Sequence, residues 1–133
     1  CLGYPYTIIG KVVNGYHEGR KLGFPTANLD MSHFGQLIPA PGVYAVNARM
    51  ENTVVWKHGM MNIGTRPTFN GKGITLETHI FNFDGDIYNQ LLLVSFVKRI
   101  RGERKFDGPE ELALQLKEDE ETVLSLFDKE AER

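Results

Sequence analysis

The sequence predicts an all-β domain, an antiparallel sheet closed into a barrel or folded as a sandwich, followed by a C-terminal helix. Up to Ile100, short runs of β-branched and aromatic residues are separated by turn dipeptides such as Asn14-Gly15, Asn70-Gly71 and Asp84-Gly85. Beyond that point, apolar residues recur at helical spacing. The chain has 133 residues, the length of one domain, and we treat residues 1–133 as a single unit.

The expected strands are the runs between these turns. The longer ones are Tyr6–Val13, Gly42–Met50, Ile74–Phe83 and Leu91–Ile100, and the shorter ones are Thr53–Trp56 and Met60–Ile63. No helical pattern separates consecutive runs, so the strands should pair antiparallel.

The expected helix runs from Pro109 to Ala131. Asp107 supplies an N-cap acceptor, Pro109 fits the first turn, and Glu110 stands three residues after the cap. Any break in this helix should fall in the acidic run 118–121, which we interpret as a solvated face.

Composition excludes several classes of protein. The net charge is −2 and the pI is about 6.1, so there is no global attraction to nucleic acid or to anionic lipid. No apolar stretch approaches the length that spans a membrane. The single cysteine, Cys1, fits a reducing compartment, and we expect a cytoplasmic protein. Because the chain starts with Cys1 and not Met, we expect it to be part of a longer polypeptide.

The most informative segment is 19–30, GRKLGFPTANLD. Pro25 favours an extended backbone before it, and in an extended chain Thr26 and Asn28 project to the same side. A hydroxyl and an amide oxygen side by side suit Mg²⁺, and Lys21 adds positive charge nearby. The segment therefore indicates either a phosphate site or a polar loop with an Asn turn.

A second segment, residues 75–83, holds a carboxylate among aromatic side chains. Strand alternation places Glu77 on one face with His79, Phe81 and Phe83, and Leu76, Thr78 and Ile80 on the other. Glu77 is therefore a candidate general base, and the alternative is an edge-strand Glu paired with a Lys or Arg.

A third segment, Arg101–Asp107, joins the last strand to the helix. It carries three cations and one aromatic ring, which could clamp a planar anionic or polar ligand. It could equally be a solvated connection, although loops on a rigid scaffold often carry binding residues.

Together these segments resemble riboflavin kinase. Gly23–Asn28 reproduces the family signature G-x-P-T-A-N, and Glu77–Ile80 reproduces its E-T-H-I strand. Arg101–Phe106 is similar to its arginine-containing loop that ends in Phe before the helix, and Met61–Thr68 is similar to the bacterial form. The opening residues Leu2–Tyr6 resemble the entry to the kinase module of bifunctional bacterial riboflavin kinase/FAD synthetases.

The resemblance implies a six-stranded antiparallel Greek-key barrel with a C-terminal helix. It implies transfer of the γ-phosphoryl of ATP to the ribityl 5′-hydroxyl of riboflavin, giving FMN and ADP, with Mg²⁺ as cofactor. The implied partners are the small molecules riboflavin and ATP and a covalent N-terminal adenylyltransferase module, with no nucleic acid and no membrane. A catalytically silent flavin- or nucleotide-binding barrel and a barrel that binds single-stranded nucleic acid are the alternatives, and the acidic charge balance disfavours the second.

The resemblance also assigns roles to residues. Glu77 matches the catalytic base, and Thr26 and Asn28 match the residues that hold Mg²⁺ and nucleotide phosphates. Positions that match the nucleotide site are Gly15, Lys21, Ile80, Asn82 and Tyr88, and positions that match the flavin loop are Arg101, Arg104 and Phe106.

Overall fold

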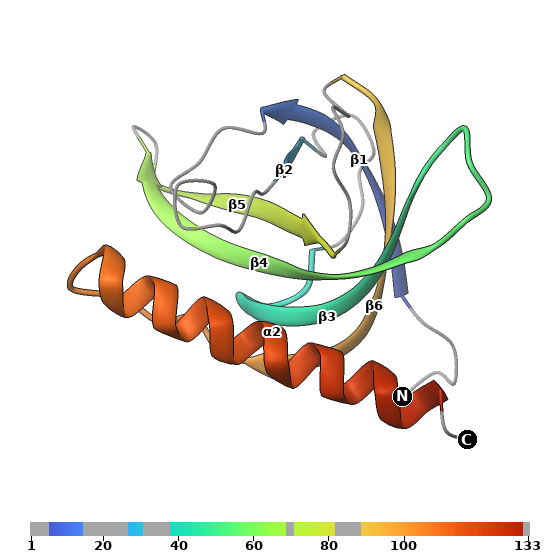
Figure 1. Ribbon diagram of the computed structural model, residues 1–133. Helices are drawn as coiled ribbons and strands as arrows, with labels where there is room; N and C mark the ends of the chain where they lie inside the picture. Colours follow the sequence, from blue (N-terminus) through green and yellow to red (C-terminus); the bar gives the residue numbers. More distant parts are fainter. Residues whose placement is uncertain (1–5, 15–26, 31–37, 69–70, 82–88, 132–133) are drawn as a thin grey trace.

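The computed structural model describes residues 6–14, 27–30, 38–68, 71–81 and 89–131 of the chain (Figure 1). In this described part it contains six strands and one C-terminal helix. The strands are β1 (Tyr6–Asn14), β2 (Ala27–Asp30), β3 (Gly42–Met50), β4 (Lys57–Thr68), β5 (Gly71–Ile80) and β6 (Leu91–Arg101), and the helix is α2 (Pro109–Ala131).

The strands form a closed barrel in the order β1-β2-β5-β4-β3-β6, and every neighbouring pair is antiparallel. Strands β3, β4 and β5 follow one another as a meander, while β2 lies beside β5 and β6 lies beside β3. This is the Greek-key arrangement, in which a long connection returns a strand to the edge of a meander. The predicted six-stranded antiparallel barrel is confirmed, and a sandwich is excluded.

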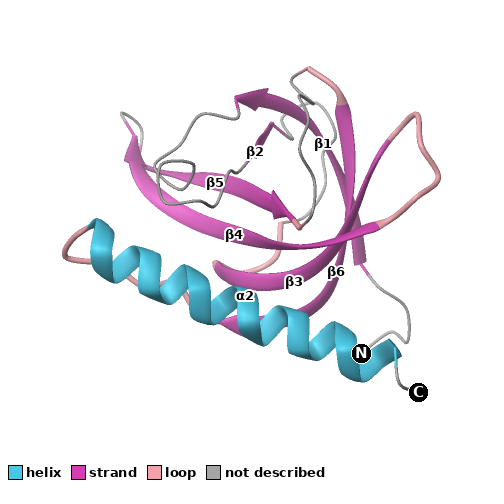
Figure 2. Cartoon of the chain, in the orientation of Figure 1, coloured by secondary structure: helices cyan, strands magenta, loops and turns pink. Residues whose placement is uncertain are grey.

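Two apolar clusters hold the fold together. One fills the barrel interior and includes Ile8, Met61, Ile63, Leu92 and Val94, each at most 1% exposed. The other lies on the outer surface, where α2 crosses the barrel (Figure 2). Its members are Val43, Ala45 and Met60 with Phe81, Val123 and Phe127. The barrel interior is therefore packed with side chains, and functional side chains must lie outside it.

The structure confirms most of the expected elements. β3 has the predicted bounds, and α2 runs unbroken from Pro109 to Ala131 through the acidic run 118–121. Its first backbone bond runs from the N–H of Leu112 to the carbonyl of Gly108. The N-cap is therefore Gly108, one residue later than predicted.

Two expectations about strands differ from the structure. The predicted strand Thr53–Trp56 is wrong, because this segment is the connection between β3 and β4 and Val54 is 88% exposed. Its β-branched residues favour a strand, yet they pair with none of the strands that the structure describes. Conversely, the structure contains a strand that the sequence does not predict. The four residues of β2 are expected only to be extended, and they form a strand between β1 and β5.

Candidate functional site

One row of backbone partners crosses five strands of the barrel. It begins at Asn28 on β2, continues through Glu77 on β5, Asn62 on β4 and Val43 on β3, and ends at Arg101 on β6. Neighbouring strands lie about 4.8 Å apart, so Glu77 and Arg101 are separated by about 14 Å along the sheet. The register therefore connects the candidate metal ligand, the candidate base and the start of the candidate flavin loop.

The side chains of this row lie on the outer surface of the barrel. Ala27 and Leu29, the neighbours of Asn28, are buried in the interior cluster, as are Leu76 and Ile80 on either side of Glu77. Since successive side chains of a strand point to opposite faces, Asn28 and Glu77 point outward together.

Asn28 carries an unusual polar atom. Its Oδ1 is buried and has no hydrogen-bond partner among the residues that the structure describes. A buried carbonyl oxygen without a partner is costly, and binding to a hard cation would remove that cost. No group of three or more His, Cys, Asp or Glu side chains capable of holding a metal occurs in the described ranges. The Oδ1 of Asn28 is a neutral oxygen of the kind that Mg²⁺ accepts as a ligand.

Glu77 stands at the boundary between the covered and the open outer surface. The next outward residues, His79 on β5 and Phe81 directly after it, are buried beneath α2, and the His79 Nε2 lies 3.7 Å from the Glu120 Oε2. Glu77 itself is only partly buried. The predicted alternation of Glu77, His79 and Phe81 against Leu76 and Ile80 is confirmed.

The loop after β6 is attached to α2 at its first residue. The Nε and Nη2 of Arg101 donate to both carboxylate oxygens of Asp119, over 2.8 to 3.1 Å. Asp119 is 2% exposed, and Arg101 also donates through Nη1 to the carbonyl of Gly102. A buried carboxylate therefore fixes the start of this segment, while residues 102–105 are exposed.

The middle of this loop is attached to β4. Glu103 accepts hydrogen bonds from the backbone N–H of Thr65 at 2.8 Å and from the Thr65 hydroxyl at 3.1 Å. The β3–β4 pairing ends at Ile63, so the Thr65 N–H lies beyond the end of β3. Gly64 leaves room for the carboxylate, since a Cβ there would lie 3.2 Å from Glu103 Oε2. Gly64 pairs with Thr75, two residues from Glu77, so this attachment brings the loop beside the row.

Phe106 lies at the end of the loop beneath two guanidinium groups. The Cζ of Arg104 is 5.0 Å from the ring centroid and that of Arg101 is 5.9 Å from it. Arg104 also donates to Glu111 at 2.8 Å and to Gln115 on α2. The three residues that match the flavin loop therefore form one contiguous group.

Other predicted residues are not brought into this group. The side chain of Ile80 is in the interior cluster, so a nucleotide contact at this position would involve its backbone. Gly15, Lys21, Thr26, Asn82 and Tyr88 lie outside the described residues. The sequence reasoning did not select Asn62, Glu103 or Asp119. The signal for Asp119 was the spacing of Glu111, Gln115 and Asp119, which places three polar residues on one stripe of a helix.

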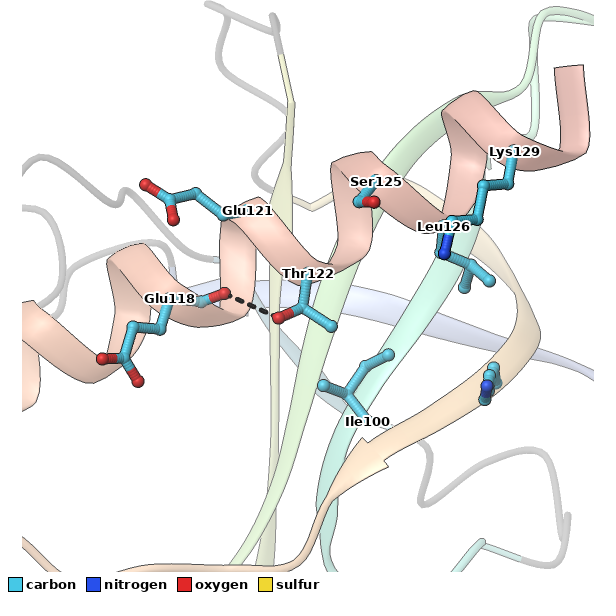
Figure 3. Close-up of a pocket in the computed structure, with 8 residues that line it drawn as sticks. Ile100, Glu118, Glu121, Thr122, Ser125, Leu126 and Lys129 are labelled. Carbon is cyan, nitrogen blue, oxygen red and sulfur yellow. Dashed lines mark hydrogen bonds between the residues drawn. The ribbon is translucent and has the colours of Figure 1, made fainter. Parts of the chain in front are cut away.

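A separate hollow lies between α2 and the outer face of β6 (Figure 3). It has a volume of about 570 Å³. Its lining residues are Lys98, Ile100, Glu118, Glu121, Thr122, Ser125, Leu126 and Lys129. None of the predicted site residues lines it, and the Thr122 hydroxyl there already donates to the carbonyl of Glu118. The candidate site is therefore the row with its adjoining loop.

The fold and the row define a small antiparallel barrel with a candidate ligand site on its outer surface. A family model described as Flavokinase, riboflavin kinase, matches residues 2–127. A bifunctional riboflavin kinase/FMN adenylyltransferase of Haemophilus influenzae is 42% identical over 126 residues, which are 95% of this chain and 40% of that relative. The chain thus spans well under half the length of this relative.

Two solved structures are similar to this barrel. One, described as a macrolide-efflux protein of Streptococcus pneumoniae, superposes with a TM-score of 0.82 at 38% identity, over 92% of this chain and 39% of that one. The other, riboflavin kinase of Trypanosoma brucei, gives a TM-score of 0.63 at 20% identity, over 97% of this chain and 83% of that one. The second likeness supports the fold alone. The chain belongs to the riboflavin kinase family and forms a riboflavin kinase domain.

The helical residues in the described part of the chain form no stretch that is long and apolar enough to cross a membrane.

Proposed function

We propose that this domain transfers the γ-phosphoryl group of Mg-ATP to the ribityl 5′-hydroxyl of riboflavin, releasing FMN and ADP. Membership of the riboflavin kinase family supports this reaction. The observation that carries the assignment of the site is the pairing of Asn28 with Glu77. It brings an amide oxygen with no partner among the described residues beside a carboxylate.

Glu77 serves as the general base in this proposal. The 5′-hydroxyl oxygen forms a bond to the γ-phosphorus as the bond from that phosphorus to the β–γ bridging oxygen breaks. The hydroxyl proton passes to the Glu77 carboxylate, and ADP leaves with the bridging oxygen. Because phosphoryl transfer has a loose transition state, the base needs mainly to orient the alcohol and accept its proton.

Asn28 contributes its Oδ1 to the metal and phosphate site, together with the neighbouring Thr26. A neutral amide oxygen is a suitable ligand for Mg²⁺, which keeps several waters and takes other oxygens from substrate phosphates. When bound, Mg²⁺ neutralises charge on the transferring phosphoryl group. Gly15, Lys21, Ile80, Asn82 and Tyr88 complete the nucleotide site by family resemblance.

The flavin ring binds at the loop that contains Arg101, Arg104 and Phe106. A partly exposed aromatic ring and two guanidinium planes provide flat, polarisable surfaces for a planar heterocycle. The attachment of Glu103 to Thr65 holds the loop at β4, the strand next to β5, so a ring bound at the loop can extend its ribityl chain toward Glu77.

The direct test is incubation of the purified chain with riboflavin and ATP, with Mg²⁺ or with a chelator, followed by chromatographic detection of FMN. We expect FMN only when Mg²⁺ is present. Riboflavin binding without FMN formation would instead identify a silent flavin-binding barrel.

Asn28→Ala tests the metal site within the same assay. We expect the Mg²⁺ concentration for half-maximal activity to rise about ten-fold or more, because even loss of an outer partner of a metal ligand has that effect. Asn52→Ala, at an exposed turn position, is the matched control and should leave this concentration unchanged. An unchanged Mg²⁺ dependence in Asn28→Ala would remove Asn28 from the metal site.

In the full-length protein, we propose, an adenylyltransferase module precedes this domain and uses the FMN that it makes. The support is the relative of Haemophilus influenzae, which combines both activities and is matched over 40% of its length. The isolated chain should then produce FMN but no FAD. The family and the single cysteine support a cytoplasmic location.

A further inference from the structure

Asp119 is the most buried charged residue in the described part of the chain. Its side chain is 2% exposed, although it lies on α2, whose neighbouring positions 118 and 121 are exposed. Burial of a carboxylate is tolerated only when partners replace its hydration. Asp119 accepts from the Nε and Nη2 of Arg101 and from the Nε2 of Gln115 at 3.0 Å, so these partners belong to α2 and to the last residue of β6.

The bidentate pair gives the Arg101 guanidinium one orientation. Two of its nitrogens are directed to Asp119, the third is directed to the carbonyl of Gly102, and its Cζ lies over the ring of Phe106. A planar group with five donors in a fixed fork loses its rotational freedom when it is held at both ends. Asp119 therefore determines where Arg101 lies relative to Phe106.

A second connection reaches the same loop through Gln115. Its Nε2 donates to Asp119, and its Oε1 accepts from Arg104, whose guanidinium also lies over Phe106. Glu111, one turn earlier, accepts from Arg104 as well. Because residues four apart share a helix face, Glu111, Gln115 and Asp119 form one polar stripe that holds both arginines.

We propose that Asp119 is a positioning residue for riboflavin binding, holding Arg101 and Phe106 in the arrangement that accepts the flavin ring. This inference rests on the proposed function of the loop. Asp119 is buried and accepts hydrogen bonds from the side chains of Arg101 and Gln115, so it acts through Arg101 and not on the substrate itself. A residue needed only for folding would lower stability without changing substrate affinities, which makes the two roles separable.

The test is Asp119→Asn, which keeps the shape of the side chain and removes its charge. Riboflavin binding is measured by quenching of riboflavin fluorescence, and KM for Mg-ATP, kcat and Tm are measured on the same preparation. We expect the riboflavin Kd to rise about ten-fold, because side chains that were held in place must now be ordered on binding. KM for Mg-ATP should stay within about two-fold of the parental value, which is the size of effect expected from a neutral surface substitution.

Glu121→Gln is the matched control. It also removes a carboxylate from α2, but at an exposed position away from the polar stripe, and it should change neither Kd nor Tm. If Asp119→Asn lowers Tm while both substrate affinities stay at the parental values, Asp119 is structural and the proposal is overturned.

A double-mutant cycle tests whether Asp119 affects riboflavin binding through Arg101. In an Arg101→Gln background, Asp119→Asn should have little further effect on the riboflavin Kd, since the side chain that it positions is gone. Full additivity of the two effects would overturn the proposal. If Asp119→Asn does not fold, Gln115→Met weakens the same stripe more gently, and an unchanged riboflavin Kd there would also count against it.

The outcome is independent of the proposed phosphoryl transfer. If the parental chain binds riboflavin but makes no FMN, the proposed function fails, while the fluorescence titration still decides the role of Asp119.

Discussion

The two faces of β5 are made by one stretch of chain, yet they meet different physical demands. Leu76, Thr78 and Ile80 point inward, where each is at most 7% exposed. Glu77 and His79 point outward, where α2 covers His79 and leaves Glu77 partly accessible. The inner face packs the barrel interior, and the outer face carries the candidate general base. Substitutions on the two faces should therefore separate stability from activity.

The largest separation should come from Glu77→Gln. The amide keeps the size of the side chain but cannot accept the proton, so kcat should fall by about 10²- to 10⁴-fold. Riboflavin and nucleotide affinities should change little, and Tm should be maintained or rise slightly because a neutral amide is easier to bury than a carboxylate. Initial rates and melting curves on one preparation provide both values.

Glu51→Gln is the control for that substitution, because Glu51 is exposed in the turn after β3. It should match the parent in rate and in Tm. If Glu77→Gln melts earlier and yet turns over at nearly the parental rate, Glu77 is a structural ion-pair partner and not the base.

The opposite separation should come from Leu92→Ala on β6. Leu92 is fully buried in the interior cluster, so truncation leaves a cavity and should lower the free energy of unfolding by about 2–5 kcal/mol. The riboflavin Kd at a temperature well below the new Tm should remain parental. Denaturant titration and flavin titration measure the two quantities, and a large rise in Kd would show that the interior packing and the outer site are coupled.

Some of the elements on which these predictions depend can be predicted from the sequence, and others cannot. The bounds of β3 follow from a run of apolar residues that is buried on both faces, and those of α2 follow from helical spacing. Thr53–Trp56 has strand-forming residues but no partner among the described strands. β2 has only four residues, and it becomes a strand because β1 and β5 pair with it. Pairing depends on tertiary structure, so the local sequence predicts neither the absence of a strand at 53–56 nor the formation of β2.

The same limit applies to the site. Glu77, Asn28 and the loop residues could be selected from their motifs, and strand alternation correctly placed Glu77 with His79. Asp119 could not be matched to Arg101, because the two are 18 positions apart and belong to different elements. A buried ion pair depends on where helix and strand pack, which composition and spacing do not determine.

A smaller effect should come from Thr78→Val on the inner face of β5. The Thr78 hydroxyl is buried without a hydrogen-bond partner in the described part of the molecule, and valine has the same shape without that group. The variant should gain about 1 kcal/mol in the free energy of unfolding. Thr7→Val, at an exposed position of β1, is the control and should not gain. A loss of stability in Thr78→Val would indicate that the hydroxyl is satisfied in solution.

The smallest effect should come from Val54→Ser in the β3–β4 connection. Val54 is 88% exposed and makes no part of either apolar cluster, so the free energy of unfolding should change by less than about 0.5 kcal/mol. Rate and substrate affinities should equal those of the parent. A clear loss in any of them would show that this connection contributes to one of the two faces after all.

Closure of the barrel also has a consequence for the order of folding. β1 and β6 seal the sheet through pairs such as Tyr6 with Phe96, which join nearly opposite ends of the strand-forming sequence. The hairpins β3–β4 and β4–β5 close much shorter loops and can assemble first, whereas the seam must wait until β6 has been synthesised. A nascent chain on the ribosome therefore exposes an unsealed sheet until β6 emerges, about 90 residues after β1, which takes roughly 5–20 s at ordinary elongation rates.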